Sequence, residues 1–248
     1  MSSRRFMIAS RTIRDGFAAC DGDLFNHIIR VLRLGTGASL TLIDEKGKEY
    51  QGVINQIDRE WVIIKITEAS ATPSPESGSP RITICQALPK GDKTDLILQK
   101  GTELGAHEFW FFGGRRSVAR VREEQRSAKL ERWNRITSEA ARQSRRRTIP
   151  AVSWFPTAAD AAATSDHELR LLLFEGENRQ GLKGLVSNRA NPASAIVAIG
   201  PEGGFDALEV EQFTGRDFLS VFLGKNILRT ETAAIAIMAI LQYVWDES

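Results

Sequence analysis

The sequence predicts an α/β protein in which a small β-rich region precedes a larger region built on a parallel sheet. Three observations carry this prediction. Short segments rich in β-branched residues lie close together before residue 70, and a stretch rich in proline and serine follows them. Beyond residue 80, apolar strand-like runs alternate with helical patterns, which is typical of a parallel sheet covered by helices on both faces. The last two apolar runs end in loops rich in glycine, where an open α/β sheet is expected to bind a ligand.

The N-terminal region is predicted to hold one helix and three short strands. Residues 23–34 carry apolar side chains at helical spacing and stop at Gly35. The segments that follow alternate in polarity or are β-branched, with a turn at 44–47 between the first two. The expected strands span 39–43, 49–57 and 61–66. Several short strands at this spacing favour a small barrel.

A linker separates the two regions. Residues 69–80 contain three prolines, one glycine and four serines, and they show no apolar period. We therefore predict a first domain at 1–70, a linker at 71–80 and a second domain at 81–248.

The second domain is predicted from the alternation of strand and helix patterns after the linker. The expected strands span 82–87, 108–112, 171–174, 193–199 and 218–223. The expected helices span 92–104, 125–143, 181–187, 207–213 and 233–241. Because each strand is followed by a helix, the strands are expected to run parallel.

The composition argues against several classes of protein. With 42% hydrophobic and 26% charged residues, the chain is expected to be soluble and globular. Its longest uninterrupted apolar run, 233–241, is too short to span a bilayer, and its start lacks the apolar core of a signal peptide. Cys20 and Cys85 have no metal-binding spacing, and the three histidines are scattered. We expect reduced thiols in a cytoplasmic protein, with neither a membrane partner nor a metal.

Positive charge is concentrated in two segments. Residues 113–148 contain eleven arginines and one lysine against four glutamates, a net charge of +8. The first 35 residues carry six arginines against three aspartates, although the net charge of the whole chain is only +2. Clustered arginines favour contacts with phosphates, so an anionic polymer is a candidate partner. A solvated helix face is the alternative interpretation for 125–148.

The two C-terminal glycine loops are candidates for a cofactor site. The first, 200–204, lacks the spacing of a dinucleotide fingerprint, and the second, 224–232, lacks the Gly-Lys-Ser/Thr of a phosphate loop. Pro201 removes an amide that a pyrophosphate would use, and Glu202 would repel phosphate. A glutamate in the loop suits a ligand with a cationic end. S-adenosylmethionine is such a ligand, because it carries a sulfonium and an amino group. A tight structural turn remains the alternative interpretation for 200–204.

Several segments of the chain resemble one known family. Residues 199–205, 223–224 and 227–233 together resemble the C-terminal motifs of the 16S rRNA uridine-N3 methyltransferase family, which belongs to the knotted SPOUT methyltransferases. Upstream segments agree with the same family in the same order, namely 27–33, 90–93, 99–105 and 139–150. The family usually has a Pro-Arg pair where this chain has Lys225 and Asn226.

The resemblance implies a fold, a cofactor and an assembly. The N-terminal part would be a PUA-like barrel that helps to dock RNA, and the C-terminal part a SPOUT α/β domain with a deep trefoil knot. The family is homodimeric, and its knot loops form the S-adenosylmethionine pocket. The pocket would be lined by Phe174, Glu175, Gly176, Ile199, Gly200, Pro201, Glu202, Gly203, Gly204, Leu223, Gly224, Ile227, Leu228, Thr230 and Thr232.

The implied reaction is methylation of N3 of a uridine in 16S rRNA of the small ribosomal subunit. This nitrogen is neutral and a poor nucleophile, so it must lose its proton as the methyl group moves, and negative charge then spreads onto the flanking carbonyl oxygens. Arg229 is the candidate for stabilising that charge, and Glu231 for accepting the proton or holding Arg229 in place. A helix start, with Thr230 as N-cap and Glu231 in the first turn, is the alternative interpretation of the same residues.

The residues assigned to RNA are expected to contact phosphates rather than take part in the chemistry. They are Arg30, Arg33, Lys90, Lys93, Lys100, Arg115, Arg116, Gln143 and Arg146. Two other functions remain open on the sequence: a SPOUT methyltransferase acting on another rRNA or tRNA position, and a non-catalytic RNA-binding or ribosome-assembly protein.

Overall fold

The computed structural model describes residues 5–44, 48–69, 80–146, 148–174, 180–186 and 190–245. Its contacts divide the chain into two compact units: Met1–Glu76 with Arg145–Ile149, and Ser77–Ser144 with Pro150–Ser248. All of the expected linker except Pro80 lies outside the described residues, so the predicted domain bounds stay predictions.

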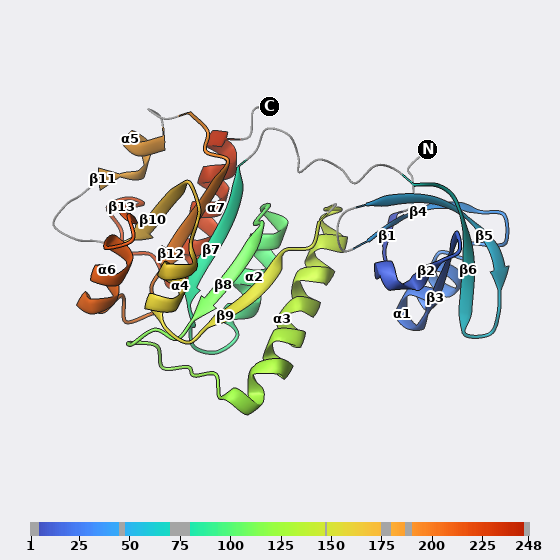
Figure 1. The fold of residues 1–248 in the computed structure, drawn as a ribbon, viewed down its shortest axis with the longest axis horizontal. Helices are drawn as coiled ribbons and strands as arrows, with labels where there is room; N and C mark the ends of the chain where they lie inside the picture. Colours follow the sequence, from blue (N-terminus) through green and yellow to red (C-terminus); the bar gives the residue numbers. More distant parts are fainter. Residues whose placement is uncertain are drawn as a thin grey trace. The chain divides into compact units, whose positions relative to one another are not determined.

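The first unit contains a curled six-stranded sheet in the order β1-β4-β5-β6-β3-β2 (Figure 1). Its strands are β1 Arg5–Met7, β2 Ile13–Arg14, β3 Phe17–Asp21, β4 Ser39–Ile43, β5 Glu49–Ile57 and β6 Trp61–Ala69. The predicted strands at 39–43 and 49–57 are confirmed, and the third continues to Ala69. The sequence prediction missed β1, β2 and β3. In β3 the buried side chains are Ala18 and Cys20, whose small size gives only a weak alternation.

The predicted helix at 23–34 is present in a different form. A short α-helix, α1 Gly22–Phe25, passes directly into the π-helical turn η2 Asn26–Val31, and a short 3₁₀ turn, η1 Ser10–Thr12, lies earlier in the chain. The N–H of Leu32 donates to the carbonyl of His27, five residues back, which is the wide spacing of a π-helix. Arg33 has a φ of 52° in the left-handed region, so the helix ends before the predicted position.

The second unit contains a seven-stranded sheet in the order β11-β13-β10-β12-β7-β8-β9, and its strand pairs are parallel. The strands are β7 Arg81–Ala87, β8 Glu108–Phe112, β9 Ala151–Phe155, β10 Leu169–Leu173, β11 Gln180–Gly181, β12 Ser194–Ile199 and β13 Leu219–Phe222. The helices are α2 Lys93–Glu103, α3 Glu123–Gln143, α4 Ala158–Thr164, α5 Leu182–Val186, α6 Ala207–Thr214 and α7 Thr230–Trp245. The predicted parallel sheet is confirmed.

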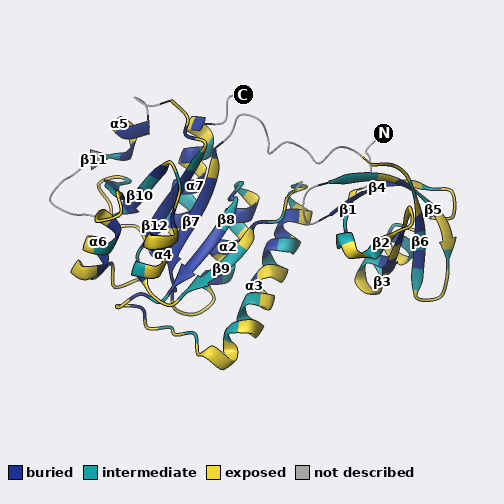
Figure 2. Ribbon diagram, viewed as in Figure 1, coloured by how far each residue is buried: buried dark blue, intermediate teal, exposed yellow. Residues whose placement is uncertain are grey.

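Helices cover both faces of this sheet (Figures 1 and 2). Phe109 and Phe111 of β8 pack into one core with residues of α2, α3 and α7, whereas Trp110 and Phe112 pack into the other with residues of α4 and α6. Because both faces are buried, a central strand such as β8 forms a continuous apolar run, which is why its position could be predicted.

The sequence prediction missed β9 and α4. β9 is an edge strand whose residues are mostly only half-buried, so its apolar pattern is weak. α4 begins with a capping box in which the Thr157 side chain accepts from the backbone N–H of Asp160 and the Asp160 carboxylate accepts from that of Thr157. This spacing before an alanine run is a sequence signal for the helix.

Within the described residues, no helix combines the length and apolar character needed to cross a membrane.

Candidate active site

A cavity of about 490 Å³ opens at the carboxyl ends of three neighbouring strands of the second unit. β10 lies between β12 and β13, and the residues that follow these strands form the walls: Phe174 after β10, Gly200 and Glu202 after β12, and Leu223 after β13. Thr230, the first residue of α7, adds a further wall. Open α/β sheets bind ligands at this edge, and the volume is in the range of small-molecule sites.

The structure gathers most of the predicted cofactor residues around this cavity. The lining includes Phe174, Ile199, Gly200, Pro201, Glu202, Gly204, Leu223, Ile227, Leu228 and Thr230, together with Arg229. Gly203, Gly224 and Thr232 belong to the same segments but are not in the lining, and Glu175 and Gly176 lie outside the described residues. The assignment of these residues to a cofactor stays a prediction.

The first glycine loop is a tight turn anchored in the core. The N–H of Gly204 donates to the carbonyl of Pro201 (2.9 Å), and Gly204 has a φ of 68° that few other residues tolerate. A Cβ on Gly200 would lie 3.1 Å from the backbone nitrogen of Phe205. The Phe205 ring is buried, with its centroid 5.7 Å from that of Phe213. The structural turn, which was the alternative interpretation, is therefore present and lies on the wall of the cavity.

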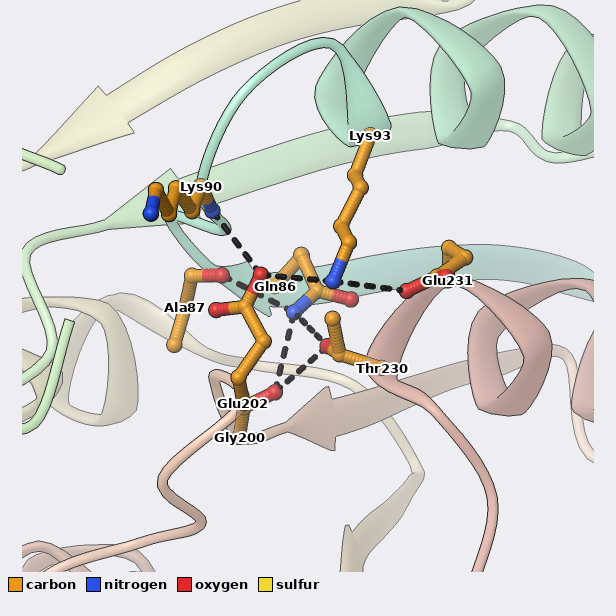
Figure 3. A network of polar contacts seen from close by, with 8 residues as sticks. All are labelled: Gln86, Ala87, Lys90, Lys93, Gly200, Glu202, Thr230 and Glu231. Carbon is orange, nitrogen blue, oxygen red and sulfur yellow. Dashed lines mark hydrogen bonds and ion pairs between the residues drawn. The ribbon is translucent and has the colours of Figure 1, made fainter. Parts of the chain in front are cut away.

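A buried glutamine joins this loop to α7 (Figure 3). Gln86 on β7 donates from Nε2 to Thr230 Oγ1 (2.8 Å) and to the carbonyl of Gly200 (3.2 Å). The Thr230 hydroxyl in turn donates to the Gly200 carbonyl (2.6 Å). Thr230 is the first residue of α7 and not its N-cap, which corrects the alternative interpretation of this residue. The sequence prediction missed Gln86, although a glutamine near the carboxyl end of an apolar strand is a signal for a polar site.

Lys93, Glu202 and Glu231 form an ion-paired group at the cavity (Figure 3). Lys93 Nζ lies 2.8 Å from Glu202 Oε1 and 3.4 Å from Glu231 Oε2. The hydrogen bond to Glu202 raises the pKa of Lys93. Burial raises the pKa of Glu202, but hydrogen bonds from Lys93 and from backbone N–H groups outweigh it, so this pKa lies below its ordinary value. Two acidic residues against one lysine suit a ligand with a cationic group.

Arg229 and Glu231, the predicted catalytic residues, flank Thr230 at the start of α7. Arg229 is exposed and lines the cavity. Glu231 lies in the first turn of α7, and within the described part of the chain its ion pair is with Lys93 rather than Arg229. Both catalytic assignments stay predictions.

The residues predicted to bind RNA are divided between the two units. The first unit contains Arg30, Arg33 and Arg146, and the second contains Lys90, Lys93, Lys100, Arg115, Arg116 and Gln143. Lys93 lies at the cavity, as described above, and Lys100 pairs with Glu103 one helical turn later (2.8 Å). The RNA contacts stay predictions.

Arg115 and Arg116 lie on a loop that is fixed against α6. The buried carboxylate of Glu209 accepts hydrogen bonds from the backbone nitrogens of Arg115 and Asp206, both at 2.8 Å. The Asp206 carboxylate lies 3.3 Å from Arg115 Nε and 3.9 Å from Arg116 Nε. Arg116 also donates to the carbonyl of Gly203 in the glycine loop (3.3 Å). These arginine side chains remain 61% and 53% exposed, so their guanidiniums are accessible to phosphates.

Two family matches define the class of protein. Residues 76–242 match the family described as RNA methyltransferase domain, and residues 21–67 match the RNA methyltransferase PUA domain. A parallel α/β domain with a cavity at its strand ends, preceded by a PUA domain, is therefore the fold of an RNA methyltransferase. Among the described residues, no group of three or more histidine, cysteine, aspartate or glutamate side chains could hold a metal ion.

Individual relatives give the family. The chain is 32% identical to Ribosomal RNA small subunit methyltransferase E of Bacillus subtilis (strain 168) over 90% of this chain and 88% of that protein. It is also 32% identical to the protein of the same name from Aquifex aeolicus (strain VF5), over 86% of this chain and 88% of that protein. The crystal structure of a Ribosomal RNA small subunit methyltransferase E from Neisseria gonorrhoeae, bound to S-adenosyl methionine, superposes with a TM-score of 0.81 at 28% identity and covers 98% of each chain.

The chain belongs to the ribosomal RNA small subunit methyltransferase E family. The predicted fold class, a PUA-like domain followed by an α/β methyltransferase domain with a parallel sheet, is confirmed. The trefoil knot stays a prediction.

Proposed function

We propose that this chain transfers a methyl group from S-adenosylmethionine to N3 of a uridine in the 16S rRNA of the small ribosomal subunit. One observation carries the proposal: a cavity lies at the ends of β10, β12 and β13 in a chain whose relatives are named for methylation of small-subunit ribosomal RNA. The bound cofactor would supply a methyl group on a positively charged sulfur.

The residues of the cavity fit this cofactor. The strand ends contribute apolar side chains such as Leu173, Ile199 and Val221, which suit the adenine ring. The carboxylate of Glu202 lies on the wall and suits the cationic amino end. The Neisseria gonorrhoeae relative, solved with S-adenosyl methionine, supports the same ligand for this chain.

The residues at the start of α7 would carry the proton and the developing charge. We assign to the Glu231 carboxylate the removal of the proton from N3 of uracil, with Lys93 holding that carboxylate in place through its ion pair. The negative charge left on the base spreads over two carbonyl oxygens. The guanidinium of Arg229 would stabilise this charge more in the transition state than in the ground state, and so lower the barrier.

A second copy of the chain is the partner that we propose for the exposed apolar face of α7. Ile240, Tyr243 and Val244 on this helix are 36%, 88% and 39% exposed. Ile240 and Val244 line a cavity of about 430 Å³ together with Leu182 and Phe222. Sedimentation equilibrium should give twice the chain mass of 27.5 kDa, whereas a monomer at micromolar concentration would contradict the proposal. A cytoplasmic location follows from a ribosomal substrate and stays a prediction.

Methyl transfer to isolated ribosomal subunits tests the proposed function. Purified protein and tritiated S-adenosylmethionine are incubated with small subunits from a strain that lacks this modification. We expect label in 16S rRNA and, after nuclease digestion, 3-methyluridine as the labelled nucleoside. Label in a ribose-methylated nucleoside, or no label in 16S rRNA, would contradict the assignment of uracil N3.

RNA affinity should fall steeply with salt, and Arg115 and Arg116 should account for part of that dependence. Replacing both with alanine is expected to flatten the plot of log affinity against log salt by about 0.7 for each lost contact with single-stranded RNA. Filter binding at several salt concentrations measures the slope. Arg216→Ala is the matched control, because this exposed residue follows α6 at the opposite end of the sheet from the cavity. An unchanged slope in the double variant would remove these arginines from the RNA interface.

A further inference from the structure

Gln86 is a buried amide at the point where three segments of the second unit meet. It precedes the last residue of β7 and has no exposed surface. Its Nε2 lies 2.8 Å from the carbonyl oxygen of Ala87, 3.2 Å from that of Gly200 and 3.4 Å from that of Ile199. It also lies 2.8 Å from Thr230 Oγ1 (Figure 3). One side chain therefore bonds to its own strand, to the loop after β12 and to the start of α7.

The chemistry of this position requires a donor. The acceptors around Nε2 include three backbone carbonyls, and a primary amide offers two N–H groups to share among them. The Thr230 hydroxyl accepts from Gln86 and donates to the Gly200 carbonyl at 2.6 Å. These hydrogen bonds connect β7, through the first residue of α7, to the glycine loop. The Oε1 atom of Gln86 is buried and has no hydrogen-bond partner among the described residues. A buried acceptor without a partner lowers stability, which argues that this residue serves more than packing.

We propose that Gln86 is a positioning residue for methyl transfer. Gly200 opens the loop proposed to hold the cofactor, and Thr230 stands between the proposed catalytic residues Arg229 and Glu231. By bonding to both, Gln86 fixes the position of the cofactor loop relative to the residues that act on the base. Misplacement by about 1 Å is enough to lower a rate on the order of 10²-fold. This inference rests on the proposed function.

Gln86→Met and Thr230→Val test the proposal, because each removes one member of the bonded chain and keeps similar volume. For both we expect kcat at saturating cofactor to fall by about 10²-fold and the Kd for S-adenosylmethionine, measured by calorimetry, to rise. Thr230→Ser restores the hydroxyl and should recover most of the activity. Thr83→Val is the matched control, because Thr83 is also buried on β7 and its hydroxyl bonds to His167 (2.8 Å) at the other end of the strand. It should lower Tm and leave kcat and Kd unchanged.

Gln86→Glu supplies a pH readout that a purely structural role would not give. An ionised carboxylate cannot donate and would face several acceptor oxygens, whereas the protonated acid has one O–H to donate. The ratio of this variant's Kd for S-adenosylmethionine to that of the wild type should therefore fall as the pH is lowered from about 8 to about 5.5. Over this range a buried carboxyl takes up its proton. Gln86→Met should show a constant ratio over the same range.

The outcomes separate this inference from the proposed function. Wild-type values of kcat and Kd in Gln86→Met and Thr230→Val, with only Tm lowered, would overturn the positioning role and leave the proposed function intact. A ratio that does not change with pH in Gln86→Glu would overturn it as well. A wild-type protein that neither binds S-adenosylmethionine nor transfers methyl groups would instead overturn the proposed function.

Discussion

Replacing Arg229 by alanine is expected to lower the rate of methyl transfer by about 10²–10³-fold, the usual loss when one charge-stabilising donor is removed from an active site. Arg229 lines the cavity, is exposed and immediately precedes α7. Its guanidinium is needed only when negative charge develops on the base, so kcat should fall while the Kd for S-adenosylmethionine stays close to that of the wild type. Single-turnover methyl transfer and calorimetry measure the two quantities separately.

Two further variants sharpen this prediction. Arg229→Lys keeps the charge but loses the planar pair of donors, so it should recover only part of the rate. Arg216→Ala removes a charge of the same kind from the turn after α6 and should transfer methyl groups at the wild-type rate. Full turnover by Arg229→Ala would remove this residue from the mechanism.

Replacing Phe213 by alanine is expected to lower the free energy of unfolding of the second unit by about 3–5 kcal/mol. The Phe213 ring is fully buried, and its centroid lies 5.7 Å from that of Phe112, 5.7 Å from that of Phe205 and 4.9 Å from that of Phe218. Truncation leaves a cavity between the rings of Phe112, Phe205 and Phe218, and these rings cannot move enough to fill it. Because Phe205 directly follows the glycine loop, the same change should also weaken binding of S-adenosylmethionine.

Denaturant unfolding followed by tryptophan fluorescence measures this loss. Four of the five tryptophans belong to the second unit, so the signal reports mainly on that unit. Leu208→Ala is the matched control, because Leu208 lies on the same helix but is 43% exposed, and its cost should stay within about 0.5 kcal/mol. A similarly small cost for Phe213→Ala would show that the aromatic cluster does not anchor the loop.

The elements that could be predicted from the sequence are those with strong local patterns. β8 and β12 are apolar along their length because both faces of the sheet are covered, and α2 and α6 show helical spacing bounded by turn residues. Strands at an edge or with small side chains, such as β9 and β3, were missed because partial burial leaves little pattern to recognise.

The contacts that organise the site could not be predicted in the same way. The glycine loops are visible in the sequence, but the hydrogen bond from Gln86 to Thr230 joins residues 144 positions apart. The bond between Lys93 and Glu202 spans 109 positions, so no local pattern places Lys93 at the cavity. Such pairings depend on the order of strands in the sheet, which no local pattern specifies.

A crystal structure of the protein soaked with S-adenosylmethionine tests the central claim most directly. The account predicts density for the cofactor in the cavity bounded by the ends of β10, β12 and β13, with its methyl group facing Arg229 and Glu231, which flank the first residue of α7. A cavity that stays vacant at saturating cofactor, or a cofactor bound elsewhere on the chain, would contradict it.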